Sequence, residues 1–240
     1  MAPPYPRKIS STIINLFAKI FSTFSPIRWK RYNELSYWKG RKNAECLLSN
    51  DHYKHFYTTH FELDESFYKD KVILDIGCGP RGSLEWASMA SRRIGLDPLA
   101  NEYLKLGANQ HEMEYICAAS EKIPMIDAEC DVVFSYNSLD HVENVDQTLR
   151  EIKRVTCPEG LFLLLVEVNH PPTECEPNEL APKELIEYLK PEFICEGLSV
   201  YKAKGTGMYT SILADEKISN PEDTEELGYM SARFIRVASN

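Results

Sequence analysis

The chain has 240 residues, of which 43% are hydrophobic and 26% are charged. This suits one α/β domain with an extension and excludes collagen-like, mucin-like and wholly disordered proteins. The longest apolar run, residues 161–166, is much shorter than the roughly 20 residues that a membrane-spanning helix needs. The charge is uneven, because residues 1–42 hold nine Lys or Arg and one acid, whereas the rest of the chain holds 18 bases and 35 acids. An acidic body repels phosphates, so we expect no nucleic-acid partner.

The seven cysteines are widely spaced and form no CxxC pair. An odd number of scattered thiols is typical of a reducing compartment. The N-terminus does not resemble a secretory signal, because polar residues interrupt its apolar segment and no small-residue cleavage site follows. We therefore expect a cytoplasmic protein. His52 and His55 near Cys46 fit no strong zinc pattern, so the sequence predicts no metal site.

The N-terminal part of the chain, residues 1–70, is predicted to be a helical cap. Residues 9–24 place apolar side chains at helical spacing, which predicts a short amphipathic helix that ends at Pro26. This helix has basic neighbours and could contact an acidic membrane, but docking against the acidic body or against a second subunit of a homodimer is favoured. Residues 27–70 are rich in aromatic residues and should be helical with short turns. The segment 51–61 has two open interpretations, a lid over a ligand or an aromatic layer packed on the sheet.

From residue 71, predicted strands and helices alternate. The expected strands are 72–76, 93–97, 114–118, 131–136, 161–168, 193–201 and 208–214, and the expected helices are 83–90, 100–107, 145–155 and 182–190. This order predicts an α/β, Rossmann-like, doubly wound, mostly parallel seven-stranded sheet with helices on both faces. No helix separates the last two strands, so one of them should be antiparallel. The domain is expected to span 71–217, followed by a C-terminal tail, 218–240, in which 229–237 is a weaker candidate for a strand.

A glycine-rich loop directly follows the first predicted strand. Gly77, Gly79 and Gly82 stand between that strand and a predicted helix. Glycine allows backbone conformations and a close approach that a Cβ would block. Open α/β sheets bind ligands at this edge, beyond the carboxyl ends of the strands. Alone, the loop is a weak signal, because it also fits dinucleotide-binding dehydrogenases.

Two aspartates make the loop more specific. Asp75 precedes the first glycine by two residues, where a carboxylate would repel a pyrophosphate but attract an ammonium group. Asp97 ends the next strand, where a carboxylate can accept hydrogen bonds from both hydroxyls of a ribose. Taken singly, each could be an ordinary turn or cap residue. Taken together, one acid for an amine and one for a ribose favour S-adenosylmethionine over NAD as the cofactor.

Five stretches of the chain, in this order, resemble the class I S-adenosylmethionine-dependent methyltransferases. They are the glycine motif at 72–79, the segment 94–98, the stretch 118–124, the strand and turn at 130–142, and the helix and strand within 149–166. The resemblance covers about residues 70–215. It implies a methyltransferase that uses S-adenosylmethionine and acts on a small-molecule or sugar-like acceptor.

The resemblance also implies which residues contact the cofactor. They are Asp75, Gly77, Cys78, Gly79, Asp97, Pro98, Ala119, Ser120, Glu121 and Asn137. The loop would hold the methionine portion, Asp97 the ribose hydroxyls and residues 119–121 the adenine, and Asn137 would lie near the sulfonium. Many relatives carry Asp where Ala119 or Ser120 stands, so here the adenine contact falls to Ser120, the backbone or Glu121. Pro80 and Arg81 also depart from the small residues usual in this loop.

The chemistry expected of such an enzyme is an in-line displacement, and a hydroxyl acceptor must also lose a proton. His141 and His170 follow the fourth and fifth strands and are candidate bases, with Glu167 beside the second. A packing role is the alternative for His141, and a plain loop position for His170. O-methylation is expected, although nitrogen, sulfur or activated carbon would need no strong base. Two other functions stay open: a cofactor-binding partner subunit without turnover and, less favoured because of Asp75, an NAD-dependent oxidoreductase.

Overall fold

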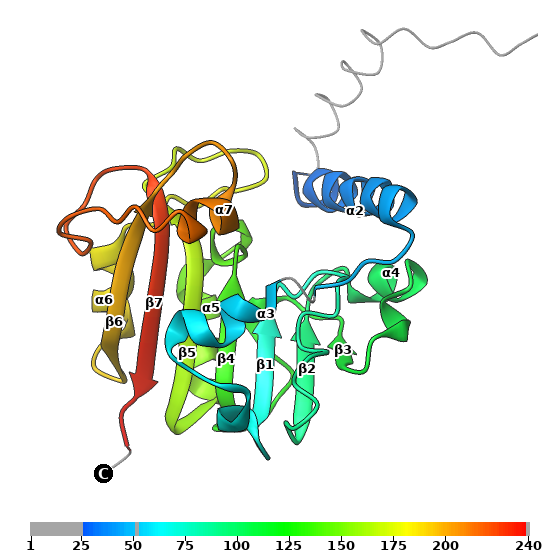
Figure 1. Cartoon of the computed structure of the whole chain (residues 1–240), viewed down its shortest axis with the longest axis horizontal. Helices are drawn as coiled ribbons and strands as arrows, with labels where there is room; N and C mark the ends of the chain where they lie inside the picture. The colour runs from blue at the N-terminus through cyan, green and yellow to red at the C-terminus, as the bar shows by residue number, and fades with distance from the viewer. Residues whose placement is uncertain (1–25, 51–52, 239–240) are drawn as a thin grey trace, which may run out of the picture.

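The structure is a computed structural model that describes residues 26–50 and 53–238. The predicted helix at 9–24 lies outside them. The chain forms one seven-stranded sheet of order β3-β2-β1-β4-β5-β7-β6, with helices packed on its two faces (Figure 1). The strands are β1 Val72–Ile76, β2 Arg92–Leu96, β3 Glu114–Ile116, β4 Cys130–Tyr136, β5 Thr156–Val168, β6 Phe193–Lys202 and β7 Gly228–Arg236. The helices are α2 Pro26–Glu45, α3 Lys54–Tyr57, α4 Ala100–Lys105, α5 Val145–Val155, α6 Pro182–Leu189 and α7 Met208–Leu213.

The pairing of the strands confirms the predicted Rossmann-like fold. Strand β1 pairs in parallel with β2 and β4, β2 with β3, and β4 with β5. Strand β7 runs antiparallel to both of its neighbours, β5 and β6. All strands except β7 therefore run in the same direction, and their carboxyl ends share one edge of the sheet, which is where open α/β sheets bind ligands.

The seventh strand is not the one expected from the sequence. Residues 208–214 were predicted to be a strand, but they contain helix α7, and β7 supplies the seventh strand instead. Within α7, Met208, Ser211 and Ile212 are buried, which is the three-to-four-residue spacing of one helical face rather than the alternation of a strand. Strand β7 confirms the weaker strand candidate at 229–237, so the sheet extends to Arg236, beyond the expected domain end at residue 217.

The helix expected directly after the glycine loop is also absent. Residues 83–90 form consecutive turns, in which backbone N–H groups donate to the carbonyl three residues earlier, as from Ala87 to Leu84 at 3.1 Å. The N-terminal aromatic segment occupies the space beside these turns. Tyr57 and Tyr68 both contact the Trp86 ring, at centroid distances of 6.1 and 5.1 Å. The loop therefore presents backbone turns, and not the N-terminus of a helix, to the ligand edge.

The same aromatic segment forms part of the core. Phe56, Tyr57 and Phe61 are buried and pack in one cluster with Phe134 of β4 and Leu163 of β5. Burial of such a side chain contributes about 2 kcal/mol to folding. Of the two interpretations of segment 51–61, the packed layer is confirmed for these rings.

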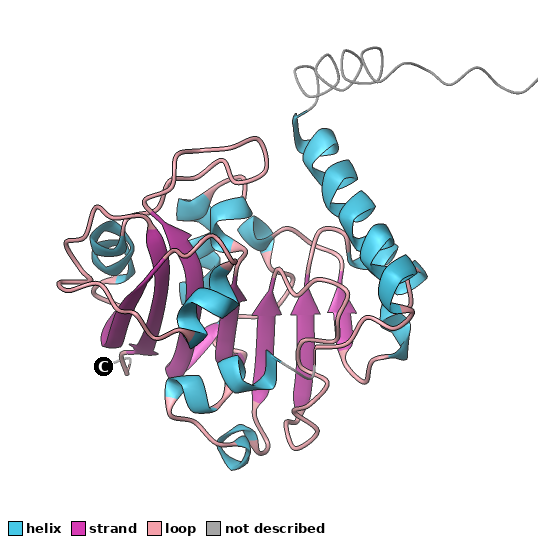
Figure 2. Ribbon diagram, turned by 45° about the horizontal axis from the view of Figure 1, so that its top comes forward, coloured by secondary structure: helices cyan, strands magenta, loops and turns pink. Residues whose placement is uncertain are grey.

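Helix α2 lies above the carboxyl ends of the parallel strands (Figures 1 and 2). Near one end of the sheet, the Tyr103 hydroxyl of α4 donates to Glu34 of α2 at 2.7 Å. Farther along, Arg31 of α2 faces Glu143 at 3.9 Å. A basic helix is thus docked on the acidic body, over the edge where a ligand would bind. No helix in the described ranges is long and apolar enough to cross a membrane.

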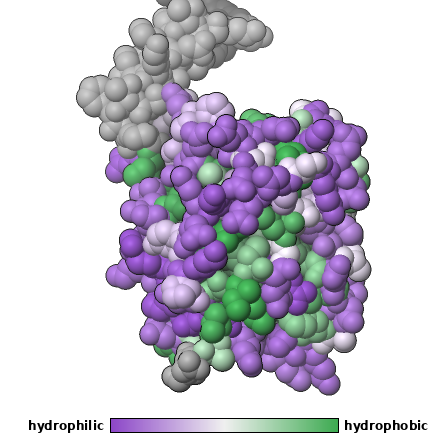
Figure 3. Space-filling view, turned by 90° about the vertical axis from the view of Figure 1, so that its left-hand side faces the viewer, coloured by the Kyte–Doolittle hydropathy of each residue, from purple (hydrophilic) through white to green (hydrophobic). Residues whose placement is uncertain are grey.

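The far end of the sheet carries a separate surface feature. Strand β6 is the edge strand, and between it and α6 lies a groove of about 420 Å³ lined in part by Ile186, Phe193 and Leu198. Figure 3 shows apolar residues gathered among hydrophilic ones on this side. The groove is at the opposite end of the sheet from α4 and is not the candidate site.

Candidate cofactor and acceptor site

The glycine loop is held tightly between two neighbouring elements. Gly77 has φ +73°, and a Cβ placed there would lie 2.3 Å from the Cβ of Ser138. Its N–H donates to the Leu96 carbonyl of β2 at 2.8 Å. The thiol of Cys78 is buried, and a Cβ on Gly95 would lie only 2.6 Å from its sulfur. The loop therefore needs glycine at position 77, and the Cys78 side chain has a packing role.

Asp97 is the residue that links the loop to the second strand. Its Oδ1 accepts from the Leu99 N–H at 2.8 Å, and its Oδ2 accepts from the Gly79 N–H at 3.3 Å. Each oxygen keeps a second lone pair that could accept a hydroxyl. Burial, together with the nearby Glu34 carboxylate, raises the pKa of Asp97 to about 7.

Asp75 lies in the neighbouring strand β1 and is also buried. The Tyr57 hydroxyl donates to its Oδ2 at 3.2 Å, and burial raises the pKa of its carboxyl to about 7. In the described part of the chain, no Lys, Arg or His forms an ion pair with Asp75 or Asp97. Two buried carboxylates without a neighbouring cation destabilise the folded protein unless a ligand offsets their charge.

Helix α2 covers the loop with side chains that sequence reasoning missed. A Cβ on Gly79 would lie 3.4 Å from the Trp38 ring. Arg81 stacks on the same ring, with its guanidinium 5.4 Å from the centroid, and pairs with Glu45 at 2.8 Å. Arg81 therefore joins the loop to α2, and is neither a solvent-facing residue nor one free to meet a ligand. No sequence motif marks Trp38, because its contact depends on how α2 docks.

The residues predicted to border the adenine are largely engaged with α5. The Ser120 hydroxyl is hydrogen-bonded to Thr148 at 2.9 Å. Glu121 accepts from the backbone N–H groups of Glu143 and Asn144, at 2.8 and 3.0 Å, just before α5 begins. An adenine contact would therefore fall mainly to the backbone around Ala119.

Two further predicted contacts lie at the same edge. The Pro98 carbonyl accepts from the Cys117 thiol at 3.4 Å. Asn137 is exposed directly after β4, has a left-handed backbone with φ 52°, and donates its N–H to Leu165 at 2.7 Å. Both positions remain open to a ligand in the predicted roles.

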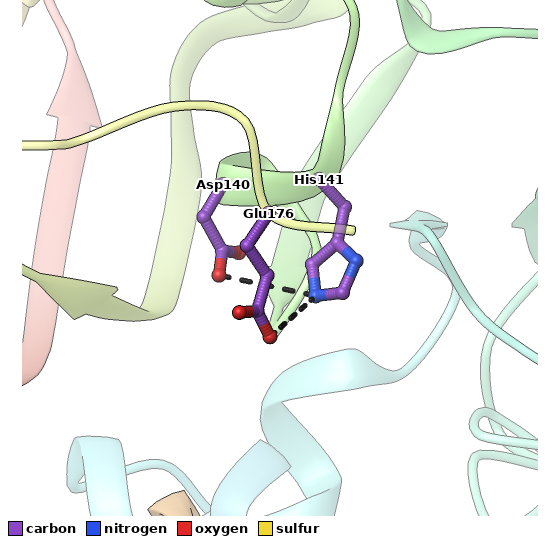
Figure 4. Close-up of side chains that lie close together, drawn as sticks. All are labelled: Asp140, His141 and Glu176. Carbon is purple, nitrogen blue, oxygen red and sulfur yellow. Dashed lines mark ion pairs between the residues drawn. The ribbon is translucent and has the colours of Figure 1, made fainter. Parts of the chain in front are cut away.

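The acceptor side is built by the turn after β4 and the loop after β5. His141 Nε2 lies 3.8 Å from Asp140 Oδ2 and 3.7 Å from Glu176 Oε1 (Figure 4). His170 Nε2 lies 3.8 Å from the same Asp140 oxygen. The structure thus brings the two predicted histidines together and adds two carboxylates that the sequence prediction lacked.

The charges in this group are strongly affected by burial. Burial raises the pKa of Asp140 to about 7 and also raises the pKa of Glu167. Burial, together with the Lys30 ammonium, lowers the pKa of His141 to about 4. His170 Nδ1 lies 3.0 Å from the Pro171 carbonyl. A carbonyl only accepts, so Nδ1 carries the hydrogen and, in the neutral ring, Nε2 keeps its lone pair.

Residues 74–164 match the family model described as a methyltransferase domain. This central stretch of the chain is a methyltransferase domain on a Rossmann-like sheet. It is 30% identical over 143 residues to the sterol 4-C-methyltransferase of Caenorhabditis elegans, covering 55% of this chain and 40% of that protein. It is 25% identical over 146 residues to a malonyl-[acyl-carrier protein] O-methyltransferase of Enterobacter lignolyticus, covering 60% and 51%. The chain spans about half the length, or less, of the curated relatives that it matches.

Solved structures share the fold of the methyltransferase domain. An S-adenosylmethionine-dependent methyltransferase from Mesorhizobium loti superposes with a TM-score of 0.54 at 17% identity, covering 72% of this chain and 94% of that one. A geranyl diphosphate C-methyltransferase from Streptomyces coelicolor, solved with S-adenosyl-L-homocysteine, gives 0.50 at 14% identity, covering 70% and 73%.

The residues of the methyltransferase domain fit the cofactor of this family, S-adenosylmethionine. When bound, it supplies an electrophilic methyl group on a sulfonium. Asp97 has lone pairs for the ribose hydroxyls, and the buried Asp75 carboxylate suits an ammonium group. The left-handed backbone at Gly77 and Gly79 leaves no Cβ between the loop and a ligand.

Proposed function

We propose that this chain is a methyltransferase that moves a methyl group from S-adenosylmethionine to an oxygen of a small-molecule or sugar-like acceptor. The observation that carries this proposal is the pair Asp75 and Asp97, both buried at the carboxyl ends of adjacent strands. Neither is paired with a basic side chain in the described ranges, so a cationic ligand with a diol would complement both. The seven cysteines are all free thiols, which supports a cytoplasmic location.

The choice of oxygen as the acceptor atom is supported by the groups at the ends of β4 and β5. A hydroxyl must lose its proton as the methyl group arrives, and His170 Nε2 has a lone pair at this edge. His141 and Glu167 lie beside it. The acceptors in the names of the relatives, a sterol and malonyl-[acyl-carrier protein], support a small or carrier-bound molecule. A partner subunit without turnover would have no use for this second group of buried side chains.

Calorimetric titration of the full chain with S-adenosylhomocysteine tests the cofactor half of the proposal. We expect wild type to bind one equivalent and the Asp97→Ala variant to lose binding. An unfolded variant is recognised by circular dichroism, and Asp97→Asn then serves as the milder replacement. Absence of binding by folded wild type, or equal affinity in the variant, would count against the function.

The acceptor half is tested with S-adenosylmethionine that carries a ¹³C-labelled methyl group. Wild type is incubated with panels of hydroxylated small molecules, and the chemical shift of the product methyl carbon distinguishes O-, N-, S- and C-methylation. We expect O-methyl product, and a His170→Gln variant that still binds S-adenosylhomocysteine but turns over more slowly. Product methylated only on carbon, nitrogen or sulfur would overturn the choice of oxygen.

A further inference from the structure

Three groups with lone pairs converge between the turn after β4 and the loop after β5. One donor atom each from Asp140, His141 and Glu176 lies within 4.8 Å of the others. Dashed lines in Figure 4 join the imidazole nitrogen Nε2 of His141 to the carboxylates of Asp140 and Glu176, at 3.8 and 3.7 Å. These separations are too long for hydrogen bonds, so the three groups face one another without a direct contact.

The buried atoms of this group lack partners. Asp140 Oδ1, His141 Nε2 and His170 Nε2 are shielded from solvent and have no hydrogen-bond partner among residues 26–50 and 53–238. The side chains of Asp140 and His170 are only 1% and 5% exposed. Buried polar atoms are almost always paired, so unpaired ones call for a bound ligand or proton.

The tautomer of His170 determines which of its nitrogens faces Asp140. Its Nδ1 donates to the Pro171 carbonyl at 3.0 Å, so the lone pair of Nε2 is directed to the Asp140 side, 3.8 Å away. Two acceptors that face each other repel, and a positively charged species between them removes the repulsion. The nearest lysine on α2, Lys30, donates to the backbone carbonyl of His141 and forms no ion pair with Asp140 or Glu176.

We propose that Asp140, His141 and Glu176 bind one divalent transition-metal cation, with His170 within reach as a further ligand. Ligand atoms about 2.1 Å from a tetrahedral metal are separated by about 3.4 Å. The two His141 separations, 3.8 and 3.7 Å, are close to this value. All three donor atoms lie within 4.8 Å of one another, so binding requires the group to close by up to about 1.4 Å. Imidazole with two carboxylates suits Mn²⁺, Fe²⁺ or Zn²⁺ better than Mg²⁺ or Ca²⁺, which prefer oxygen alone. A cation here would also offer an open position to an oxygen of the acceptor and would favour loss of its proton, so His170 would not have to act as the base while it serves as a ligand.

Mn²⁺ is the best probe, because it binds carboxylate and imidazole in preference to thiolate, and Cys175 adjoins Glu176 in the sequence. The full chain is stripped with a chelator and titrated with Mn²⁺, and the free ion is measured by electron paramagnetic resonance. We expect one saturable site in wild type and at least about tenfold weaker binding in Glu176→Gln. The matched control is Glu174→Gln on the same loop, whose carboxylate instead accepts from the Trp29 indole at 3.3 Å and whose loss should leave Mn²⁺ affinity unchanged.

The Mn²⁺ titration has two results that would overturn the metal site. A free Mn²⁺ signal that wild type does not reduce at millimolar concentration, or equal affinity in wild type and Glu176→Gln, overturns the site and leaves a shared proton as the explanation. If Glu176→Gln fails to fold, His141→Asn replaces it, because that side chain is 30% exposed. S-adenosylhomocysteine is titrated into the same samples. If S-adenosylhomocysteine binds and Mn²⁺ does not, only the metal site is contradicted. If Mn²⁺ binds and S-adenosylhomocysteine does not, only the proposed function is contradicted.

Discussion

Replacement of Asp97 by Asn should make the protein more stable and at the same time remove its affinity for the cofactor. The carboxylate is buried, and its pKa is raised from 3.8 to about 7. The ionised group therefore destabilises the free protein at neutral and higher pH. An amide has nearly the same shape and no charge, so the cost of a buried charge disappears.

The size of the effect follows from the structure. A pKa rise of about three units corresponds to about 4 kcal/mol at pH 8. Against this, an Asn side chain with its oxygen on the Leu99 N–H cannot also accept from the Gly79 N–H, a bond of 3.3 Å that contributes about 1 kcal/mol. We expect a net gain of about 1–3 kcal/mol in the free energy of unfolding at pH 8. Near pH 4 the wild-type carboxyl is protonated when folded and the gain should vanish.

Urea unfolding of both proteins without ligand, at pH 8 and pH 4, measures the effect, and calorimetry with S-adenosylhomocysteine measures the loss of binding. The matched control is Asp70→Asn, at an exposed position whose φ of 61° suits either residue, and its stability should not change. An Asp97→Asn variant that is equally destabilised at both pH values would refute the argument from burial. So would a variant that binds the nucleoside as tightly as wild type.

Three further predictions concern the same edge of the sheet. The carboxyls of Asp75 and Asp97 have folded pKa values of about 7 and ordinary values of 3.8. The folded state therefore holds more protons on these groups, and their contribution to the free energy of unfolding without ligand should fall as pH rises from about 4 to about 7. Because the lowered pKa of His141 acts in the opposite direction, the urea series compares wild type with Asp75→Asn, and a difference that stays constant with pH would contradict this. Gly77→Ala should lose about 3 kcal/mol in urea unfolding, because its Cβ would lie 2.3 Å from Ser138 at φ +73°. The control Gly205→Ala, at φ +70° with nothing within 4 Å, should lose only about 1 kcal/mol. An equal loss of stability in the two variants would show that the contact with Ser138 does not destabilise Gly77→Ala. Trp38→Ala should speed dissociation of S-adenosylhomocysteine by about tenfold in stopped flow, because the Trp38 ring covers Gly79. The control Tyr37→Ala, at an exposed neighbouring position, should leave this rate unchanged. Equal dissociation rates for Trp38→Ala and wild type would argue that α2 does not retain the ligand.

The parts of the fold that were predicted correctly have signals contained in one stretch of sequence. Strand β1 is a buried apolar run followed at once by glycines, and helix α5 shows its apolar stripe and polar face within 145–155. Helix α7 was mistaken for a strand because six residues are too few to show a period, and its conformation is decided by packing of Met208 and Ile212 into the aromatic cluster. The turns at 83–90 likewise depend on rings from a segment earlier in the chain.

The residues of the candidate site also fall into those that a local sequence pattern predicts and those that only the folded chain brings together. Asp75 and Asp97 could be predicted because each stands at the carboxyl end of an apolar strand pattern, Asp75 within β1 and Asp97 directly after β2. Glu176 could not, because it reaches His141 from a loop 35 positions away, and only the folded course of that loop sets the 3.7 Å separation. Asp140 stands next to a predicted residue, yet its burial follows from the turn at Leu139–His141, which no local pattern marks.

The position of β7 has a consequence for how the protein is made. This strand is the last of the seven in sequence, yet it lies between β5 and β6 and pairs with both. Until residues 228–236 leave the ribosome, β5 and β6 have no partner on the edges that will face it, and the nascent chain exposes two unpaired strand edges. The sheet therefore closes only when β7 inserts between two strands that precede it in the sequence.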